Sequence, residues 1–379
     1  MERVNPDEAL QARIDEAGLR TLAWLDTLGA GPGFPSDVLR LDAGHDPGLW
    51  PGMLLPATYN GIMCRCLLGG LDGWESARRE GLAGWIGGLR TSTGAYRIEG
   101  MTDANVFKKP DRQETWRYID FHVTNYTLGA LQALGAPLQA PEFAEHWLEA
   151  AALKAWLADR DMRDPWQEGN NIVNLASFLL ILRETRPKKA AEVNAVFDIL
   201  FDWHDRNQDP GTGFWGVGQG LGGERLLHAM AGSMHNFHLY YAMERPLPYQ
   251  RQAADYVLSR PTSWHSACID VDEVDLLVHA MEDHPDLAIA ARTWLRQKLI
   301  ALLDGQDPGG GFTDTRDTGW RQDGWVGGYV TAPGAPTTFA TWFRWIAIAM
   351  IDDALWPGRR AWQFRRMIGI GYRRPRTQG

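Results

Sequence analysis

Glycine-rich turns recur between apolar helical stretches, and this repeat constrains the fold more than any other feature of the sequence. Two turns, 208–215 and 306–312, share the pattern Gln-Asp-Pro-Gly-x-Gly-Phe, and a looser copy occupies 81–100. Each turn is followed by a second apolar stretch. Counted over the whole chain, such second stretches begin near Thr58, His122, Asn171, His235, Asp270 and Thr337. A repeated helical pair cannot bury its apolar face alone, so the pairs are expected to pack on one another.

The periodicity within these stretches is helical. Val271, Val274 and Val278 recur at steps of three and four residues, which places them on one face of a helix. Glycine and proline lie between the stretches and seldom inside them, and no convincing run of strand hairpins is present. Polar residues suited to cap a helix stand at the start of three stretches: Asn170, Asp270 and Thr337.

Six helical pairs of this kind can close into a ring that buries every inner helix. We therefore predict an all-α chain that folds as a single (α/α)6 toroid of six helical hairpins around a central cavity. One domain spans 1–379, in which 1–45 form an N-terminal helix and lead-in and 356–379 an arginine-rich tail. The 18 tryptophans indicate either very aromatic packing or a cavity walled by rings.

Composition excludes several classes of protein. The 379 residues carry a formal net charge of −9, which argues against a general nucleic-acid binder. Cys64, Cys66 and Cys268 are too few for a disulfide scaffold and favour a reducing compartment. No apolar run reaches the roughly 18 residues of a membrane-spanning helix, and the first residues do not form a signal segment. We expect a cytoplasmic protein without a cofactor, since no dinucleotide-binding fingerprint follows a strand.

The C-terminal tail departs from this acidic character. It carries seven arginines among apolar residues: Arg359, Arg360, Arg365, Arg366, Arg373, Arg374 and Arg376. Such a tail is able to lie on an anionic membrane surface or to hold a phosphorylated ligand. The simpler expectation is a solvated terminal helix with a frayed end.

The glycine-rich turns, each closing one helix and opening the next, resemble the repeats of terpenoid cyclases and protein prenyltransferases. The segment Asp270-Val271-Asp272-Glu273 is similar to the D-x-D-D motif of class II terpene cyclases such as squalene–hopene cyclase, with glutamate at the last position. The resemblance implies that Asp272 protonates an alkene or epoxide of an isoprenoid substrate. Asp270 and Glu273 would be its charged partners.

The crowding of these acids suits that role. Mutual repulsion among Asp270, Asp272, Glu273 and Asp275 raises some of their pKa values, so that one carboxyl stays protonated at neutral pH. Carbocations formed after the protonation require the faces of aromatic rings. The candidate rings are Trp166, Trp215, Trp264, Trp325 and Trp342.

The same cavity also suits a sugar. When the inner-helix starts are aligned, further polar residues fall level with the acids: His122, Asn125, Asn171, His235 and His238. Tryptophans would stack on the sugar, and Glu168 or Asp164 would face Asp270 or Asp272 as an acid–base pair. The alternative to terpene cyclisation is therefore glycoside hydrolysis, or lyase or epimerase chemistry on a glycan.

A third interpretation involves no catalysis. Acidic residues in the first turn of a helix are favoured by capping and by the helix dipole alone, and a toroid can bind a lipid, a glycan or a partner protein. His235 and His238 have the i, i+3 spacing of a helical metal pair. Spacing alone is weak evidence, so we predict no metal.

Overall fold

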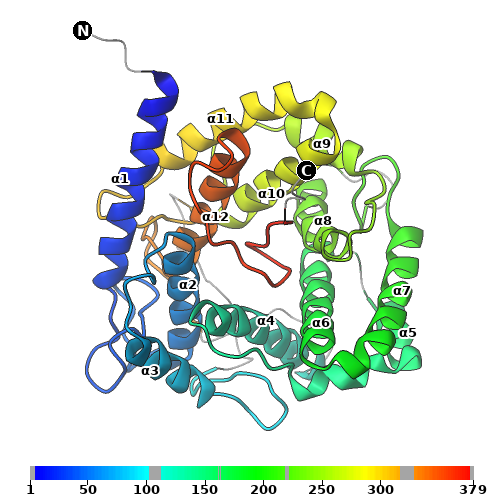
Figure 1. Cartoon of the computed structure of the whole chain (residues 1–379), viewed down its shortest axis with the longest axis horizontal. Coiled ribbons are helices and arrows are strands. Elements are labelled where there is room, and N and C mark those ends of the chain that lie inside the picture. The colour runs from blue at the N-terminus through cyan, green and yellow to red at the C-terminus, as the bar shows by residue number, and fades with distance from the viewer. Residues whose placement is uncertain are drawn as a thin grey trace.

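The computed structural model describes residues 5–101, 112–160, 162, 164–217, 222–315 and 328–375. Over these ranges the chain is helical, and the β contacts are confined to isolated bridges. The helices form an inner and an outer layer around a ring (Figure 1). The prediction of an all-α fold is confirmed.

The even-numbered helices make the inner layer: α2 (Leu54–Leu67), α4 (Arg112–Ala133), α6 (Pro165–Thr185), α8 (Glu224–Ala242), α10 (Ala267–Asp283) and α12 (Thr338–Leu355). Each of them contacts the next, and α12 contacts α2, so that the cycle closes. Their side chains are buried along almost the whole length, as in α6, α10 and α12. A helix that is buried on all sides belongs to the core. The predicted ring is therefore present.

The odd-numbered helices make the outer layer: α1 (Pro6–Asp26), α3 (Ser76–Gly87), α5 (Ala150–Ala158), α7 (Ala190–Asn207), α9 (Gln250–Leu258) and α11 (Ala288–Asp304). Four short 3₁₀ helices join them: η1 (Pro51–Met53), η2 (Glu142–Leu148), η3 (Pro187–Lys189) and η4 (Pro285–Leu287). α1 packs against α11 and α12, which brings the start of the described chain beside its last helix (Figure 1).

The glutamines of the repeated turns tie neighbouring outer segments together. The Nε2 group of each donates to a carbonyl of its own turn and to one outside it. Gln208 reaches Gly213 at 2.8 Å and Pro248 at 2.9 Å, and Gln306 reaches Gly310 at 2.8 Å and Ala17 at 2.9 Å. Gly213 and Gly310 have positive φ angles of 76° and 110°, which favour glycine. The repeated turn in the sequence is thus a repeated hydrogen-bonded connection between neighbouring helical hairpins.

Two inner helices begin earlier than the sequence suggests. The side chains of Asp164 and Ser266 each accept a hydrogen bond from a first-turn amide and cap α6 and α10. Asn170 and Asp270 therefore lie inside these helices, and the prediction that they are caps is wrong. Only Thr337 caps its helix, α12, as predicted. The earlier starts bring the acidic motif inside α10 instead of leaving it at the rim.

The C-terminal segment turns back into the middle of the ring (Figure 1). Its apolar side chains, Met367, Ile368, Ile370 and Tyr372, are buried. Burial of these four side chains is favourable, and this explains why the expectation of a solvated terminal helix with a frayed end is wrong.

The arginines of this segment are mostly engaged within the protein. Arg360 pairs with Asp352 at 2.8 Å, while Arg373 and Arg374 pair with acids at the end of α10. Arg359 and Arg366 are exposed, and Arg376 lies outside the described residues. The hypothesis that this tail lies on a membrane finds no support in these pairings. Across the described residues, every helix is too short or too polar to pass through a bilayer.

Candidate active site

Four acidic side chains of α10 are buried within two turns of the helix: Asp270, Asp272, Glu273 and Asp275. Their exposed fractions are 0 to 1%. A buried carboxylate is costly unless cations or hydrogen-bond donors compensate it. The partners of each acid therefore decide its charge.

Asp270 is compensated by two cations. Its carboxylate lies 2.5 Å from the Lys298 ammonium and also pairs with the Arg344 guanidinium. Both carboxylate oxygens accept hydrogen bonds from the His265 amide at 3.0 Å. These contacts favour the charged form of Asp270.

Glu273 shares one of these cations. Its carboxylate lies 2.9 Å from the Lys298 ammonium and pairs with the Arg260 guanidinium on its other oxygen. Lys298 comes from the outer helix α11, so the charge network links the two layers of the ring. Glu273 and Asp270 are thus joined through one shared ammonium group.

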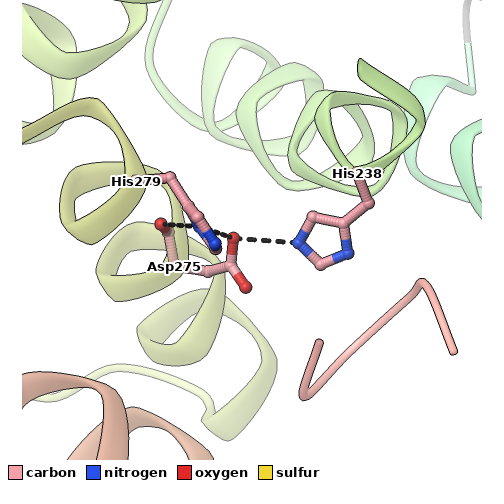
Figure 2. A group of neighbouring side chains, drawn as sticks. All are labelled: His238, Asp275 and His279. Atoms are coloured by element: carbon pink, nitrogen blue, oxygen red, sulfur yellow. Dashed lines mark hydrogen bonds and ion pairs between the residues drawn. The ribbon is translucent and has the colours of Figure 1, made fainter. Parts of the chain in front are cut away.

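Asp275 is held by two histidines (Figure 2). Its Oδ1 atom lies 2.9 Å from Nε2 of His238 on α8 and 3.0 Å from Nδ1 of His279. Burial alone would raise the pKa of Asp275, but the attraction of the two histidines and their hydrogen bonds outweighs it. The pKa of Asp275 therefore lies below its usual range. Asp275 is a carboxylate.

Asp272 has no such compensation. Both of its carboxyl oxygens are buried and have no hydrogen-bond partner among the described residues. Burial raises the pKa of Asp272 well above its ordinary value, and the charges of Asp275 and Glu273 raise it further. Burial and the neighbouring charges both favour the protonated form of this carboxyl. This sets Asp272 apart from Asp275, whose pKa is lowered.

One aromatic ring interacts with this acid, and it connects to rings on two other inner helices. Tyr126 of α4 interacts electrostatically with Asp272. Its ring stacks on Tyr59 of α2 at 5.6 Å and meets Trp342 of α12 edge-on at 5.5 Å. The His122 ring lies 4.5 Å from Tyr126. The rings form one connected group, and Trp342 is the member that the sequence predicted.

Polar atoms without partners are common on the inner helices. Among the described residues, buried side-chain atoms lacking a hydrogen bond include both amide atoms of Asn60, Nδ2 of Asn174 and Nδ1 of His235. Buried polar groups are normally satisfied. Burial lowers the pKa of His235 to about 3, so its ring is neutral. These groups are able to bind water or a ligand with polar groups.

The remaining predicted residues are distributed over several places. His122 and His235 interact electrostatically, although α6 lies between their helices. Asn125 of α4 donates to Asn174 of α6 at 2.6 Å. Glu168 pairs with Arg160 at 3.0 Å and accepts a hydrogen bond from Asn171 at 3.2 Å.

The other predicted tryptophans that the structure describes lie in separate places. Trp215 packs on Phe237, and its indole donates to the carbonyl of His204 on the outer helix α7, at 2.9 Å. Trp166 lies beside His228, with ring centroids 5.4 Å apart. Trp264 packs over the Arg344 guanidinium, and Trp325 lies outside the described residues.

Trp264 also lines an open pocket of about 570 Å³ at the end of α10. The other lining residues are Ser263, His265, Ser266, Ala301, Asp304 and Thr315. This pocket lies against the loop whose His265 amide binds Asp270. It adjoins the cation network of Asp270 and does not include Asp272.

Several residues of the site were not predicted from the sequence. Lys298 is one of six lysines in the sequence and stands on an outer helix, and its burial at 0% exposure depends on the ring. Arg344 had a signal, because it is the only charged residue in the apolar run 337–351. His279 lies four residues after Asp275, a spacing that brings two side chains together on a helix.

The cluster of His238, Asp275 and His279 has the donor atoms of a metal site. A metal requires the lone pair of each imidazole to face inward, with the other ring nitrogen protonated. Here the outward nitrogens already accept hydrogen bonds from the amides of Gly369 and Arg374, at 3.1 and 3.3 Å. A proton on either nitrogen would face another N–H group. The cluster therefore fits a hydrogen-bonded carboxylate better than a metal.

Comparisons with known proteins find little sequence similarity. No protein-family model matches the chain, and no curated protein matches it. Among solved structures, the chain is similar to ent-copalyl diphosphate synthase from Streptomyces platensis at 15% identity and a TM-score of 0.40. The match covers 94% of this chain and 70% of that chain.

Proposed function

We propose that this protein is a class II terpene-cyclase-like enzyme, in which Asp272 starts the cyclisation of an isoprenoid by protonating a carbon–carbon double bond or an epoxide. The observation that carries the proposal is the contrast on α10. Asp272 is buried without a hydrogen-bond partner among the described residues, while its acidic neighbours are compensated. This arrangement keeps one proton available in an interior that excludes water.

The proposed step is an isomerisation and needs no further reactant. The proton of the Asp272 carboxyl forms a C–H bond with the π electrons of the terminal double bond, and the carboxyl becomes a carboxylate. The positive charge moves to the more substituted carbon, where an internal double bond attacks it and closes a ring. The final cation loses a proton to water, and the Asp272 carboxylate takes up a proton from solvent after product release, so that the acid is regenerated and no proton is consumed overall.

The surroundings of Asp272 support this step. A cation and the new carboxylate attract each other strongly where water is excluded. The faces of Tyr59, Tyr126 and Trp342 stabilise a nearby cation by about 0.5 to 2 kcal/mol each. Fixed charges at Asp270 and Glu273 remain in place on their cations during the reaction, so Asp272 alone changes its charge.

The glycan alternative is less well supported by the carboxylates. Glu168 is paired with Arg160, Asp164 caps α6, and Asp270 is paired with two cations. Glycoside hydrolysis needs one free acid and one free base across the substrate. Of the carboxyls proposed for that pair, only Asp272 has the character of an acid.

The proposal is tested by incubating the protein in D₂O with isoprenoid diphosphates, squalene and a panel of oligosaccharides. Protonation by Asp272 predicts a cyclic isoprenoid product that carries one non-exchangeable deuterium, detected by mass spectrometry. Asp272→Asn should lower turnover by at least about 1,000-fold, because the amide has no acidic proton. Asp255→Asn, at an exposed acid on α9, is the control and should keep full activity.

Two outcomes would contradict the proposal. An Asp272→Asn enzyme with undiminished turnover excludes this carboxyl as the acid. Cleavage of an oligosaccharide without conversion of any isoprenoid favours the glycan alternative.

A further inference from the structure

The C-terminal loop, residues 365–374, closes on itself inside the ring. The Arg365 amide donates to the Gly371 carbonyl at 2.9 Å, and the Tyr372 amide donates to the Gly369 carbonyl at 3.1 Å. Gly369 and Gly371 have φ angles of 107° and 87°, which residues with a Cβ atom rarely adopt. The backbone of this loop is therefore fixed by its own turns.

Anchors on three inner helices hold the loop in place. On α4, the Arg365 guanidinium donates to both the carbonyl and the side chain of Asn125, at 2.5 Å. Arg373 pairs with Glu282 of α10 and, at 3.4 Å, with Asp353 of α12. Arg365 is 5% exposed, so the loop brings a guanidinium into the protein interior.

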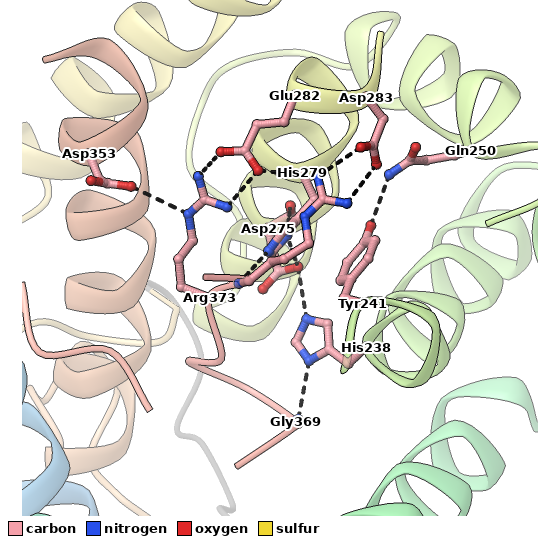
Figure 3. Close-up of polar contacts among 11 residues, drawn as sticks. His238, Tyr241, Gln250, Asp275, His279, Glu282, Asp283, Asp353, Gly369 and Arg373 are labelled. Atoms are coloured by element: carbon pink, nitrogen blue, oxygen red, sulfur yellow. Dashed lines mark hydrogen bonds and ion pairs between the residues drawn. The ribbon is translucent and has the colours of Figure 1, made fainter. Parts of the chain in front are cut away.

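Two backbone amides of the loop point at imidazoles (Figure 3). The Gly369 amide donates to Nδ1 of His238 at 3.1 Å, and the Arg374 amide donates to Nε2 of His279 at 3.3 Å. A nitrogen that accepts a hydrogen bond carries no proton. Each amide therefore favours the tautomer that carries its proton on the other ring nitrogen.

Those other nitrogens both face Asp275. Nε2 of His238 and Nδ1 of His279 donate to the same carboxylate oxygen, at 2.9 and 3.0 Å. The loop amides, together with the backbone carbonyl of Asp275 that lies 2.9 Å from Nδ1 of His279, favour this direction of the two hydrogen bonds. Hydrogen bonds from neutral rings stabilise the Asp275 carboxylate without cancelling its charge. Asp275 lies three residues after Asp272 on the same helix, and its charge opposes ionisation of Asp272.

We infer that the C-terminal loop controls the charge state of the acid at Asp272, acting through His238, His279 and the carboxylate of Asp275. This inference rests on the proposed function for its catalytic meaning. His238, His279 and the loop amides of Gly369 and Arg374 are positioning groups, since none of them donates a proton to the substrate. An open loop would leave the histidines free to become cationic and would admit water to the ring.

Other titratable groups surround the two histidines. The inner helices contribute Tyr241 and His235 from α8 and Glu282 and Asp283 from α10. The loop itself contributes Tyr372, Arg373 and Arg374. Asp353 on α12 acts indirectly, because it pairs with Arg373. Burial lowers the pKa of His279, and Asp275 partly opposes that effect. The imidazole of His279 stays neutral while the loop is closed.

The test removes one amide and keeps the rest of the chain. Arg374→Pro has no backbone N–H group to donate to His279, whereas Arg374→Ala loses the ion pairs with Glu282 and Asp283 and keeps that N–H group. Carboxyl groups are labelled with ¹³C at aspartate, and Asp272 is assigned from the Asp272→Asn variant. The carboxyl titration is followed by NMR.

We expect wild type and Arg374→Ala to keep Asp272 protonated at pH 7. Arg374→Pro should lower its titration midpoint by at least about one pH unit, because a cationic His279 cancels the charge of Asp275. An unchanged midpoint in a folded Arg374→Pro protein would overturn the inference.

A second measurement needs no variant of the loop. In wild-type protein labelled with ¹⁵N at histidine, NMR should show His238 protonated at Nε2 only and His279 at Nδ1 only. Imidazolium signals or the opposite tautomers at pH 7 would contradict the inference. Neither measurement uses a substrate. A loop-controlled acid that converts no isoprenoid would refute the proposed function alone, and cyclisation with an unchanged titration in Arg374→Pro would refute this inference alone.

Discussion

Asp272 and Asp275 occupy the same helix, are buried to the same degree, and have opposite properties. Asp275 receives hydrogen bonds from two histidines, which lower its pKa. Asp272 receives none from the described residues, and its pKa is raised. Burial is common to both, so the difference comes from the partners. A single helix can therefore hold a fixed charge and a stored proton less than two turns apart.

The largest expected effect is the loss of the fixed charge. Asp275→Asn should lower the free energy of unfolding by about 3 kcal/mol, because two buried imidazole N–H groups lose their charged acceptor. Urea denaturation at pH 7 measures this change. Asp255→Asn, at an exposed acid on α9, is the matched control and should change stability by less than about 0.5 kcal/mol. If the two variants lowered the free energy of unfolding equally, Asp275 would not be a hydrogen-bonded buried charge.

Replacing the neighbouring acid, Asp272, should change the stability in the opposite direction. The raised pKa of Asp272 means that the unfolded chain releases this proton above pH 4 while the folded chain retains it. Stability is therefore lost as the pH rises above about 4, at up to about 1.4 kcal/mol per pH unit. Asp272→Asn removes this cost and should stabilise the protein at pH 7, while leaving its stability at pH 4 nearly unchanged. A destabilised Asp272→Asn protein at pH 7 would show that the carboxyl is charged.

Buried neutral histidines predict that the protein loses stability as the pH is lowered. His235 binds a proton at about pH 3 in the folded protein and near pH 6.5 when unfolded. Between these values the unfolded state binds more protons, so stability falls as the pH is lowered. From pH 7 to 5 the loss is about 2 kcal/mol for each such histidine. His235→Gln should show a smaller loss by this amount, and an unchanged pH dependence would mean that His235 is protonated in the fold.

The smallest expected change in stability concerns the contact between the C-terminal loop and α4. A Cβ atom at Gly129 would lie 2.6 Å from Nε of Arg365, whereas a Cβ atom at Gly81 on α3 meets nothing within 4 Å. Gly129→Ala should therefore destabilise the protein by about 1 kcal/mol through overpacking. Gly81→Ala should stabilise it slightly through helix propensity. Thermal unfolding of the pair measures the difference, which should vanish if Arg365 does not lie against α4.

The sequence predicts the ring and the acidic motif for clear reasons. Helical periodicity and repeated turns are local, and the crowding of Asp270, Asp272 and Glu273 is visible along one segment. The different roles of these acids are not local, since they depend on Lys298, Arg344 and His238 from distant segments. The tryptophan predictions suffered from the same limit, because Trp215 is as suitable for the core between two layers as for a cavity wall.

The C-terminal loop illustrates a second limit. Seven arginines near one end of the sequence look like a surface feature, and their pairing with buried partners becomes visible only when the ring is assembled. The glycines of Ile368-Gly369-Ile370-Gly371 were the local signal of a tight turn. The neighbouring sequence does not indicate where this turn docks, because its partners lie on distant helices.

The position of this loop in the chain has a consequence for biosynthesis. The loop follows α1 to α12 in the sequence, so it leaves the ribosome after every helix of the ring has emerged. Segments made earlier begin to fold first. The inner helices are therefore made before the loop that docks among them, so the loop's contacts with α4, α10 and α12 form after those helices have been synthesised.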